Sequence, residues 1–146
     1  MKHILITLTV LFSLVSFSSF ANGEKVNSKV LESFNTYFKN ATEVDWTVNQ
    51  NFYKADFSLN GQYVAAYYDE AGQLMAITRN ISSTQLPISL QTNLKKDHED
   101  FWISDLFEVA NEQGTTYYIT LENADTKLIL KSMGSNWTSF QKQRKS

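Results

Sequence analysis

Apolar residues recur at three- and four-residue spacing after residue 26, and this spacing predicts an amphipathic helix. The residues on its apolar face are Val30, Leu31, Phe34, Tyr37 and Phe38. Asn27 or Ser28 can cap its start, and Asn40 marks its end. The pattern then changes to strict alternation of apolar and polar residues, which is typical of half-buried strands. The predicted strands are Val44–Val48, Tyr53–Leu59, Gln62–Asp69 and Gln73–Asn80.

The same succession of one helix and four strands begins again at Leu86-Pro87, because proline fits the first turn of a helix. Leu90 and Leu94 form a short apolar stripe in this second helix. Turn-forming residues then separate four further segments of strand type. These predicted strands are Phe101–Ala110, Thr115–Asn123, Thr126–Met133 and Trp137–Lys142.

The two halves match position by position. The spacing is 56 residues between Trp46 and Trp102, and it grows to 64 between Ala55 and Ile119. The extra residues fall in the loop around 111–114, where insertions cost little. We therefore predict an α+β fold of two tandem units, each a helix plus a four-stranded antiparallel sheet, with the helices packed on one sheet face. The units would span about 26–81 and 82–146 of a single domain, residues 22–146.

Asn60-Gly61 fixes the register of the first hairpin, since both residues tolerate the positive φ of a type I′ turn. A two-residue turn pairs Leu59 with Gln62, and alternation then divides the hairpin into two faces. The core face, which the helix covers, holds Tyr53, Ala55, Phe57, Val64, Ala66 and Tyr68. The open face holds Lys54, Asp56, Ser58, Tyr63, Ala65 and Tyr67. Trp46 alternates with polar neighbours, so we expect it to be buried against the helix.

The next turn decides where the fourth strand points its side chains. If Glu70-Ala71-Gly72 is a three-residue loop with Gly72 left-handed, Asp69 pairs with Gln73 and Met75 lies on the open face. A four-residue loop would send Met75 and Ile77 into the core instead. In the first case the candidate binding face is an aromatic, apolar and charged mixture typical of interface centres. It consists of Tyr63, Tyr67, Lys54, Asp56, Met75, Ile77 and Arg79.

Residues 1–21 have the pattern of an export signal. Lys2 is followed by a mostly apolar stretch from Ile4 to Phe17, and Ser19-Phe20-Ala21 supplies small residues for a signal peptidase. The stretch is shorter than the roughly 20 residues that span a bilayer. We therefore expect cleavage near Ala21, no stable membrane anchor, and a periplasmic or secreted protein.

Charge and composition exclude some classes of partner. Loss of Lys2 lowers the 13 basic residues to 12 against 15 acidic residues, so the mature net charge is about −3. Nucleic-acid binders need a clustered basic face, and we expect no nucleic-acid partner. Lys142, Arg144 and Lys145 do cluster near the end, where we interpret them as a frayed, solvated tail. The chain has no cysteine, so its stability must come from the core.

Side chains suited to catalysis are scarce. After cleavage His98 is the single imidazole, and it lies within Asp97-His98-Glu99-Asp100. Adjacent loop residues rarely converge on one metal ion, so we interpret this segment as a solvated loop between helix and strand. Asp45 and Asp56 could approach each other on one sheet face, but nothing predicts a raised carboxyl pKa. We expect no catalytic residue, no metal site, no cofactor and no enzymatic activity.

Several motifs resemble the PepSY-like family of exported bacterial proteins, which is itself similar to β-lactamase-inhibitor protein. The motifs are Val44-Asp45-Trp46, Tyr53-Lys54-Ala55-Asp56-Phe57, Asn60-Gly61, Tyr68-Asp69-Glu70-Ala71-Gly72-Gln73-Leu74 and Leu86-Pro87. The resemblance implies two tandem helix-plus-sheet units and an exported location, in a family whose functions are mostly unassigned. The turn Met133-Gly134-Ser135-Asn136 lacks the acidic residue of the first half, so the resemblance extends no site to the second half.

Two functional hypotheses follow. The first is a non-enzymatic exported protein that docks a protein or peptide of the cell envelope, in an inhibitor-like manner, on the open face of its sheet. The alternative is a small-molecule carrier that holds an apolar or aromatic ligand in the concavity of that sheet. The shape of the face distinguishes them, because small ligands need a cavity that buries most of their surface.

Overall fold

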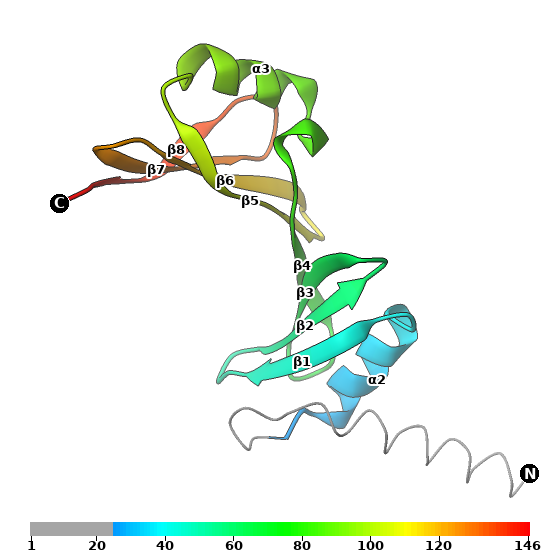
Figure 1. Ribbon diagram of the computed structural model, residues 1–146. Helices are drawn as coiled ribbons and strands as arrows, with labels where there is room; N and C mark the ends of the chain where they lie inside the picture. Colours follow the sequence, from blue (N-terminus) through cyan, green and yellow to red (C-terminus); the bar gives the residue numbers. More distant parts are fainter. Residues whose placement is uncertain (1–24) are drawn as a thin grey trace, which may run out of the picture. The chain divides into compact units, whose positions relative to one another are not determined.

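The computed structural model describes residues 25–146, and the predicted export signal at 1–21 lies outside them. Within this range the fold is α+β, with one antiparallel sheet whose eight strands are hydrogen-bonded in chain order (Figure 1). The helical elements are α2 (Ser28–Tyr37), the short 3₁₀ helix η1 (Ser83–Gln85) and α3 (Ile88–Asp97). The strands are β1 (Thr42–Val48), β2 (Tyr53–Leu59), β3 (Gln62–Tyr68), β4 (Leu74–Asn80), β5 (Trp102–Asn111), β6 (Gly114–Glu122), β7 (Thr126–Ser132) and β8 (Thr138–Arg144). Neither α-helix of this range is long and apolar enough to cross a membrane.

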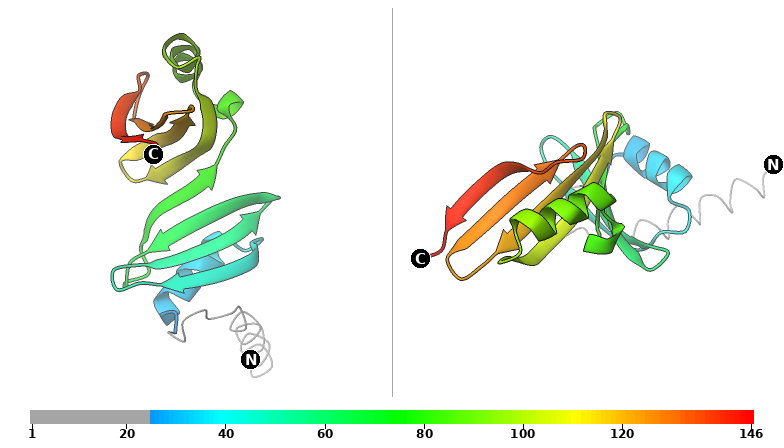
Figure 2. Two further views of the ribbon diagram at one scale, coloured as in Figure 1. Left: turned by 60° about the vertical axis from the view of Figure 1, so that its left-hand side comes forward. Right: turned by 90° about the horizontal axis from the view of Figure 1, so that it is seen from above.

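The chain divides into two compact units between Leu74 and Met75, and each unit has its own helix and core. In the first unit α2 packs against β1, β2 and β3, and in the second α3 packs against β5, β6 and β7 (Figure 2). The predicted α+β class and antiparallel sheet are confirmed. The repeat boundary near residue 81, and the duplication itself, stay predictions.

Local sequence determines how the first unit begins and what it buries. Asn27 caps α2, as predicted, because its Oδ1 accepts a hydrogen bond of 2.9 Å from the Lys29 amide. Val30 and Phe34 from the apolar stripe are buried. Trp46 is only 3% exposed, and its ring meets Phe34 edge-on at a centroid distance of 5.2 Å. The predicted burial of Trp46 against the helix is therefore confirmed.

Both predicted turns have the expected geometry. Asn60 and Gly61 adopt positive φ values of 52° and 78°, and the β2–β3 register pairs Leu59 with Gln62 as the turn requires. In the next turn the Asp69 amide donates to the Gln73 carbonyl over 3.1 Å, and Gly72 has φ of 81°. The loop thus has three residues, and the four-residue alternative is wrong.

The second core is built from aliphatic side chains. Leu90 and Leu94 of α3, the predicted stripe, are buried against Leu106, Ile119 and other aliphatic residues of the strands. Pro87 directly precedes the helix, where its fixed φ suits a helix start. A hydrogen bond of 3.0 Å from Trp137 Nε1 to the Leu90 carbonyl links the residue just before β8 to the helix.

The proposed equivalence of Trp46 and Trp102 is not matched in the structure, since Trp102 is 54% exposed. The register of β5 and β6 shifts at Ser104, where one extra residue forms a bulge. A bulge reverses which residues face the core. Leu106 therefore occupies the position expected for the tryptophan, because it pairs with Ile119 as Trp46 pairs with Ala55.

The C-terminal segment is not a frayed tail. Strand β8 continues to Arg144, and the Lys145 amide donates to the Asp125 carbonyl over 2.8 Å. Lys145 Nζ also forms an ion pair of 2.8 Å with Glu122 and lies 4.9 Å from the centroid of the Trp102 ring. These contacts fix the end of the chain to the turn between β6 and β7.

Tyr68→Phe should stabilise the protein by up to about 1 kcal/mol at neutral pH, because it removes a buried hydroxyl that lacks a hydrogen-bond partner within residues 25–146. Burial also raises the pKa of Tyr68 above its ordinary value of 10.0. The unfolded chain therefore loses this proton first, so ionisation of Tyr68 leaves the stability of the wild type unchanged below pH 10.0 and lowers it as the pH rises further. Denaturant unfolding at about pH 7, 9 and 11 should show the advantage of the variant widening above pH 10. A variant less stable than the wild type at neutral pH would mean that the hydroxyl is satisfied.

Candidate binding faces

The tyrosine face is the side of β2 and β3 that points away from α2, and it consists of Lys54, Asp56, Tyr63 and Tyr67. Cross-strand pairing is as predicted, with Lys54 opposite Tyr67 and Tyr63 opposite Ser58. Tyr63 is 73% exposed, whereas Tyr67 is half-buried because Phe52 packs beside its ring at a centroid distance of 5.6 Å. On this face the Tyr63 ring therefore projects into solvent, whereas the Tyr67 ring is held in place by Phe52.

Charges on the tyrosine face are paired with each other. Lys54 Nζ forms an ion pair of 2.9 Å with Asp56 and lies 6.0 Å from the centroid of the Tyr67 ring. Partial burial lowers the pKa of Lys54, but its hydrogen bond to Asp56 and the nearby negative charge outweigh this, and the pKa lies above its ordinary value. Asp45 and Asp56 are cross-strand partners, so the two residues lie on one sheet face as predicted. Asp56 is already engaged by its ion pair with Lys54. This pairing of charges suits polar recognition of a partner rather than proton transfer.

The three β4 residues of the predicted face belong to the second unit. Met75 is 47% exposed, as the three-residue loop requires. Ile77 and Arg79 pair with Ala110 and Glu108 of β5, and they lie on the same side of β4 as the buried Ile81. Arg79 Nε donates to the Glu108 carboxylate. Within the second unit these two side chains are thus on the side that α3 covers, not on its helix-free side.

The sequence interpretation missed a second exposed surface. The aromatic face is the side of β5, β6 and β8 that points away from α3, and it consists of Trp102, Phe107, Tyr118 and Phe140. The Phe107 and Tyr118 rings stack at 5.3 Å, and Phe140 meets Tyr118 edge-on at 5.6 Å. Trp102 and Phe140 are 54% and 55% exposed. Exposed aromatic rings at this density are typical of an interaction surface.

Lysines flank the aromatic face. Lys131 Nζ lies 5.4 Å from the centroid of the Phe140 ring, and Lys145 Nζ lies over Trp102. The hydrogen bond from Lys145 lowers the pKa of the Glu122 carboxyl group, so Glu122 stays charged to a lower pH than usual. Phe107 and Val109 alternate with Leu106 and Glu108 along β5, so their side chains lie on the opposite side of the strand from Leu106. This alternation could have revealed part of the aromatic face. The bulge at Ser104 concealed Trp102, because its apparent parity is that of the core.

His98 follows α3 as its C-cap residue, so the predicted loop between helix and strand is confirmed from His98 on, whereas Asp97 is the last residue of the helix. Its ring is half-buried and contacts the edge of Phe101 at a centroid distance of 5.9 Å. Within residues 25–146 no three histidine, cysteine, aspartate or glutamate side chains group as metal ligands would.

Comparison with known proteins gives structural matches only. No protein-family model matches the chain, and no curated protein sequence matches it significantly. A BLIP-like protein from Bacteroides fragilis has a TM-score of 0.71 at 18% identity, over 86% of this chain and 92% of that one. A protein from Bacteroides eggerthii, provisionally named as periplasmic, has a TM-score of 0.73 at 12% identity, over 83% and 90% of the two chains. A DUF2874 family protein from Bacteroides ovatus has a TM-score of 0.72 at 16% identity, over 84% and 89%.

The chain therefore has a BLIP-like fold. BLIP abbreviates β-lactamase-inhibitor protein, the protein to which the PepSY-like family is similar, and the fold implied by the sequence resemblance is confirmed to this extent. At sequence identities of 12–18%, the similarity to these structures shows the fold alone and says nothing of activity.

Proposed function

We propose that the chain is an exported, non-enzymatic binding protein that docks a protein or peptide of the cell envelope on the helix-free faces of its sheet. The observation that carries the proposal is that each unit places exposed aromatic side chains on the side away from its helix. Tyr63 is 73% exposed on the tyrosine face, and Phe140 is 55% exposed on the aromatic face. Aromatic anchors of this kind dominate binding energy at protein interfaces.

The paired charges support docking rather than chemistry. Lys54 and Asp56 satisfy each other beside Tyr67, which gives the face a polar rim with defined geometry. Support for export comes from the pattern of residues 1–21 and from the Bacteroides eggerthii protein of similar fold. An inhibitor-like action is a special case of this proposal, and it would require that the partner be an enzyme.

The alternative, a carrier with a small ligand on the open face, has less support. The cavity found in the second unit lies against α3, on the side opposite the aromatic face. The tyrosine face projects Tyr63 outward instead of enclosing a space. A projecting side chain suits insertion into a partner's pocket better than burial of a small ligand.

Changing Tyr63 and Tyr67 together to serine should weaken partner binding at least about tenfold, equivalent to about 1.4 kcal/mol, if either ring is an anchor. Tyr63→Ser alone should change stability by no more than about 0.5 kcal/mol, because its side chain is largely solvated. The loss of the Tyr67–Phe52 contact should add about 1 kcal/mol to the double variant. Retention of partner from envelope extract and denaturant midpoints measure the two effects on the same proteins.

Tyr37→Ser is the matched control. Tyr37 is 71% exposed, nearly the same as Tyr63, but it lies at the end of α2. The control should keep both stability and binding. Equal retention of a verified partner by the double variant and the wild type would reject the tyrosine face as the docking site.

A further inference from the structure

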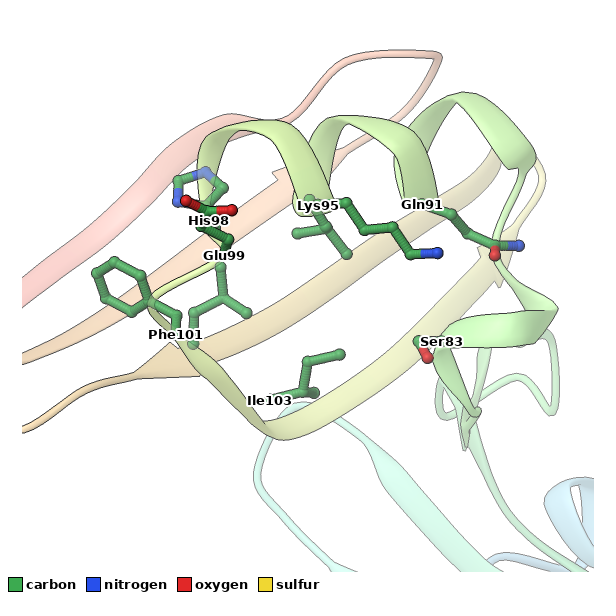
Figure 3. A pocket seen from close by; sticks show the side chains of 9 residues that line it. Ser83, Gln91, Lys95, His98, Glu99, Phe101 and Ile103 are labelled. Atoms are coloured by element: carbon green, nitrogen blue, oxygen red, sulfur yellow. The ribbon is translucent and has the colours of Figure 1, made fainter.

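A cavity of about 450 Å³ lies in the second unit between α3, η1 and the beginning of β5 (Figure 3). Leu94 and Leu121 form its buried floor, and Phe101 and Ile103 form the wall on the strand side. Ile103 is 43% exposed although it has the core parity of its strand, because it faces the cavity. The volume lies within the range of small-molecule sites and equals roughly fifteen water-sized groups.

The cavity has a clear origin in side-chain size. The helix ends match Leu94 to Phe34, because the C-cap amide donates to the Phe34 carbonyl in α2 and to the Leu94 carbonyl in α3, and the strand pairing matches Leu121 to Phe57. In the first unit the rings of Phe34 and Phe57 pack edge-on at a centroid distance of 5.1 Å and fill the space beneath the helix. Two leucines cannot fill the same space, so the second unit keeps a groove with an apolar floor.

The polar groups of the cavity are unevenly distributed. Lys95 extends along the groove towards Gln91 and Ser83, whereas His98 and Glu99 lie at the other end beside Phe101 (Figure 3). Gln91 is held in place, because its Nε2 donates to the Leu86 carbonyl over 2.8 Å. Lys95 Nζ has no ion pair with any residue in the 25–146 range. One end of an apolar groove thus carries an uncompensated positive charge, and the other end a carboxylate.

We propose that this cavity binds a small amphipathic carboxylate, an aliphatic or aryl acid of about eight to twelve carbon atoms. The carboxylate lies at Lys95, with Ser83 as a further hydrogen-bond donor, and the apolar body covers Ile103 and Leu94. Glu99 sets the orientation, since it repels an anion at the Phe101 end. The proposal concerns the helix side of the second unit and stands independently of partner docking on the helix-free faces.

Titration of the ¹⁵N-labelled mature chain, residues 22–146, with octanoate tests the proposal. Saturable amide shifts should be confined to η1, α3 and the start of β5. Octanamide, which has the same body without the charge, should bind about three- to fivefold more weakly, the upper part of the range for one exposed ion pair. Absence of saturable shifts with octanoate, or shifts centred on another part of the chain, would overturn the proposal. Equal affinity for the two compounds would remove the role of Lys95 and overturn the assignment to an anion.

Variants locate the site. Leu94→Phe places in the second unit the ring that Phe34 supplies in the first, and it should abolish the octanoate shifts by filling the groove. Ile103→Trp fills the same space from an exposed position, so it serves if the first variant fails to fold. Lys95→Gln should weaken octanoate about three- to fivefold. Lys96→Gln, the exposed neighbour outside the cavity, should leave the affinity unchanged. Wild-type affinity in both filled variants would show that the ligand lies elsewhere.

Discussion

Replacing Trp46 by alanine should lower the free energy of unfolding by about 3–5 kcal/mol, the usual range for a large aromatic side chain removed from a core. The indole is almost fully buried, and it contacts both Phe34 of α2 and Tyr68 of β3, with ring centroids 5.2 and 6.3 Å away. Its loss would leave a cavity at the junction of helix and sheet, which these neighbours cannot close without moving. Denaturant unfolding of the mature protein measures the effect.

Trp102→Ala is the matched control for this change. The side chain has the same size, but it is 54% exposed and contacts Lys145 from the solvent side. We expect a loss of at most about 1 kcal/mol, because only part of its surface leaves the solvent on folding. Similar losses in the two variants would contradict the burial pattern and with it the bulge at Ser104.

Gly72→Ala should cost about 2–4 kcal/mol, through two effects that add. The residue has φ of 81°, where alanine is strained by about 1 kcal/mol. A Cβ atom there would also lie 2.6 Å from the backbone oxygen of Lys29, in the first turn of α2. Backbone cannot yield as a flexible side chain does, and overpacking adds about 1–3 kcal/mol. The hydrogen bond of 3.0 Å from Asn27 Nδ2 to the Glu70 carbonyl holds the turn in this position.

Gly61→Ala separates the two effects. Its φ of 78° is nearly the same, but an added Cβ has no described atom within 4 Å. The variant should lose only the strain of about 1 kcal/mol, and the difference between the two glycine variants then measures the clash with α2. Equal losses in thermal or denaturant unfolding would mean that the turn does not pack on the helix.

Turn chemistry explains why much of the first unit was predictable. Asn60-Gly61 specifies a two-residue turn by itself, and that turn determines the whole β2–β3 register and the exposure of Tyr63. Gly72 did the same for the next turn. The burial of Trp46 followed from alternation, because the bulge of β1 lies before Asp45 and leaves the parity of the tryptophan unchanged.

The second unit was less predictable, because the features that shape it depend on residues far apart in the sequence or leave no signal in the local pattern. The bulge at Ser104 reverses which residues of β5 face the core, and no glycine or proline marks its position in the sequence. Trp102 therefore looked equivalent to Trp46. Lys145 looked like part of a solvated tail because its partner Glu122 is distant in sequence. The cavity beside α3 depends on the sizes of side chains from several elements, which periodicity does not report.

Site-specific photo-crosslinking tests the docking proposal most directly. A photoreactive phenylalanine analogue at Tyr63 samples the tyrosine face, and the same analogue at Tyr37 samples α2, at 73% and 71% exposure. In the native cell, illumination should give a discrete adduct to an envelope protein or peptide from position 63 and none from position 37. Adducts of equal yield from the two positions, or from position 37 alone, would contradict the assignment of partner binding to the helix-free face.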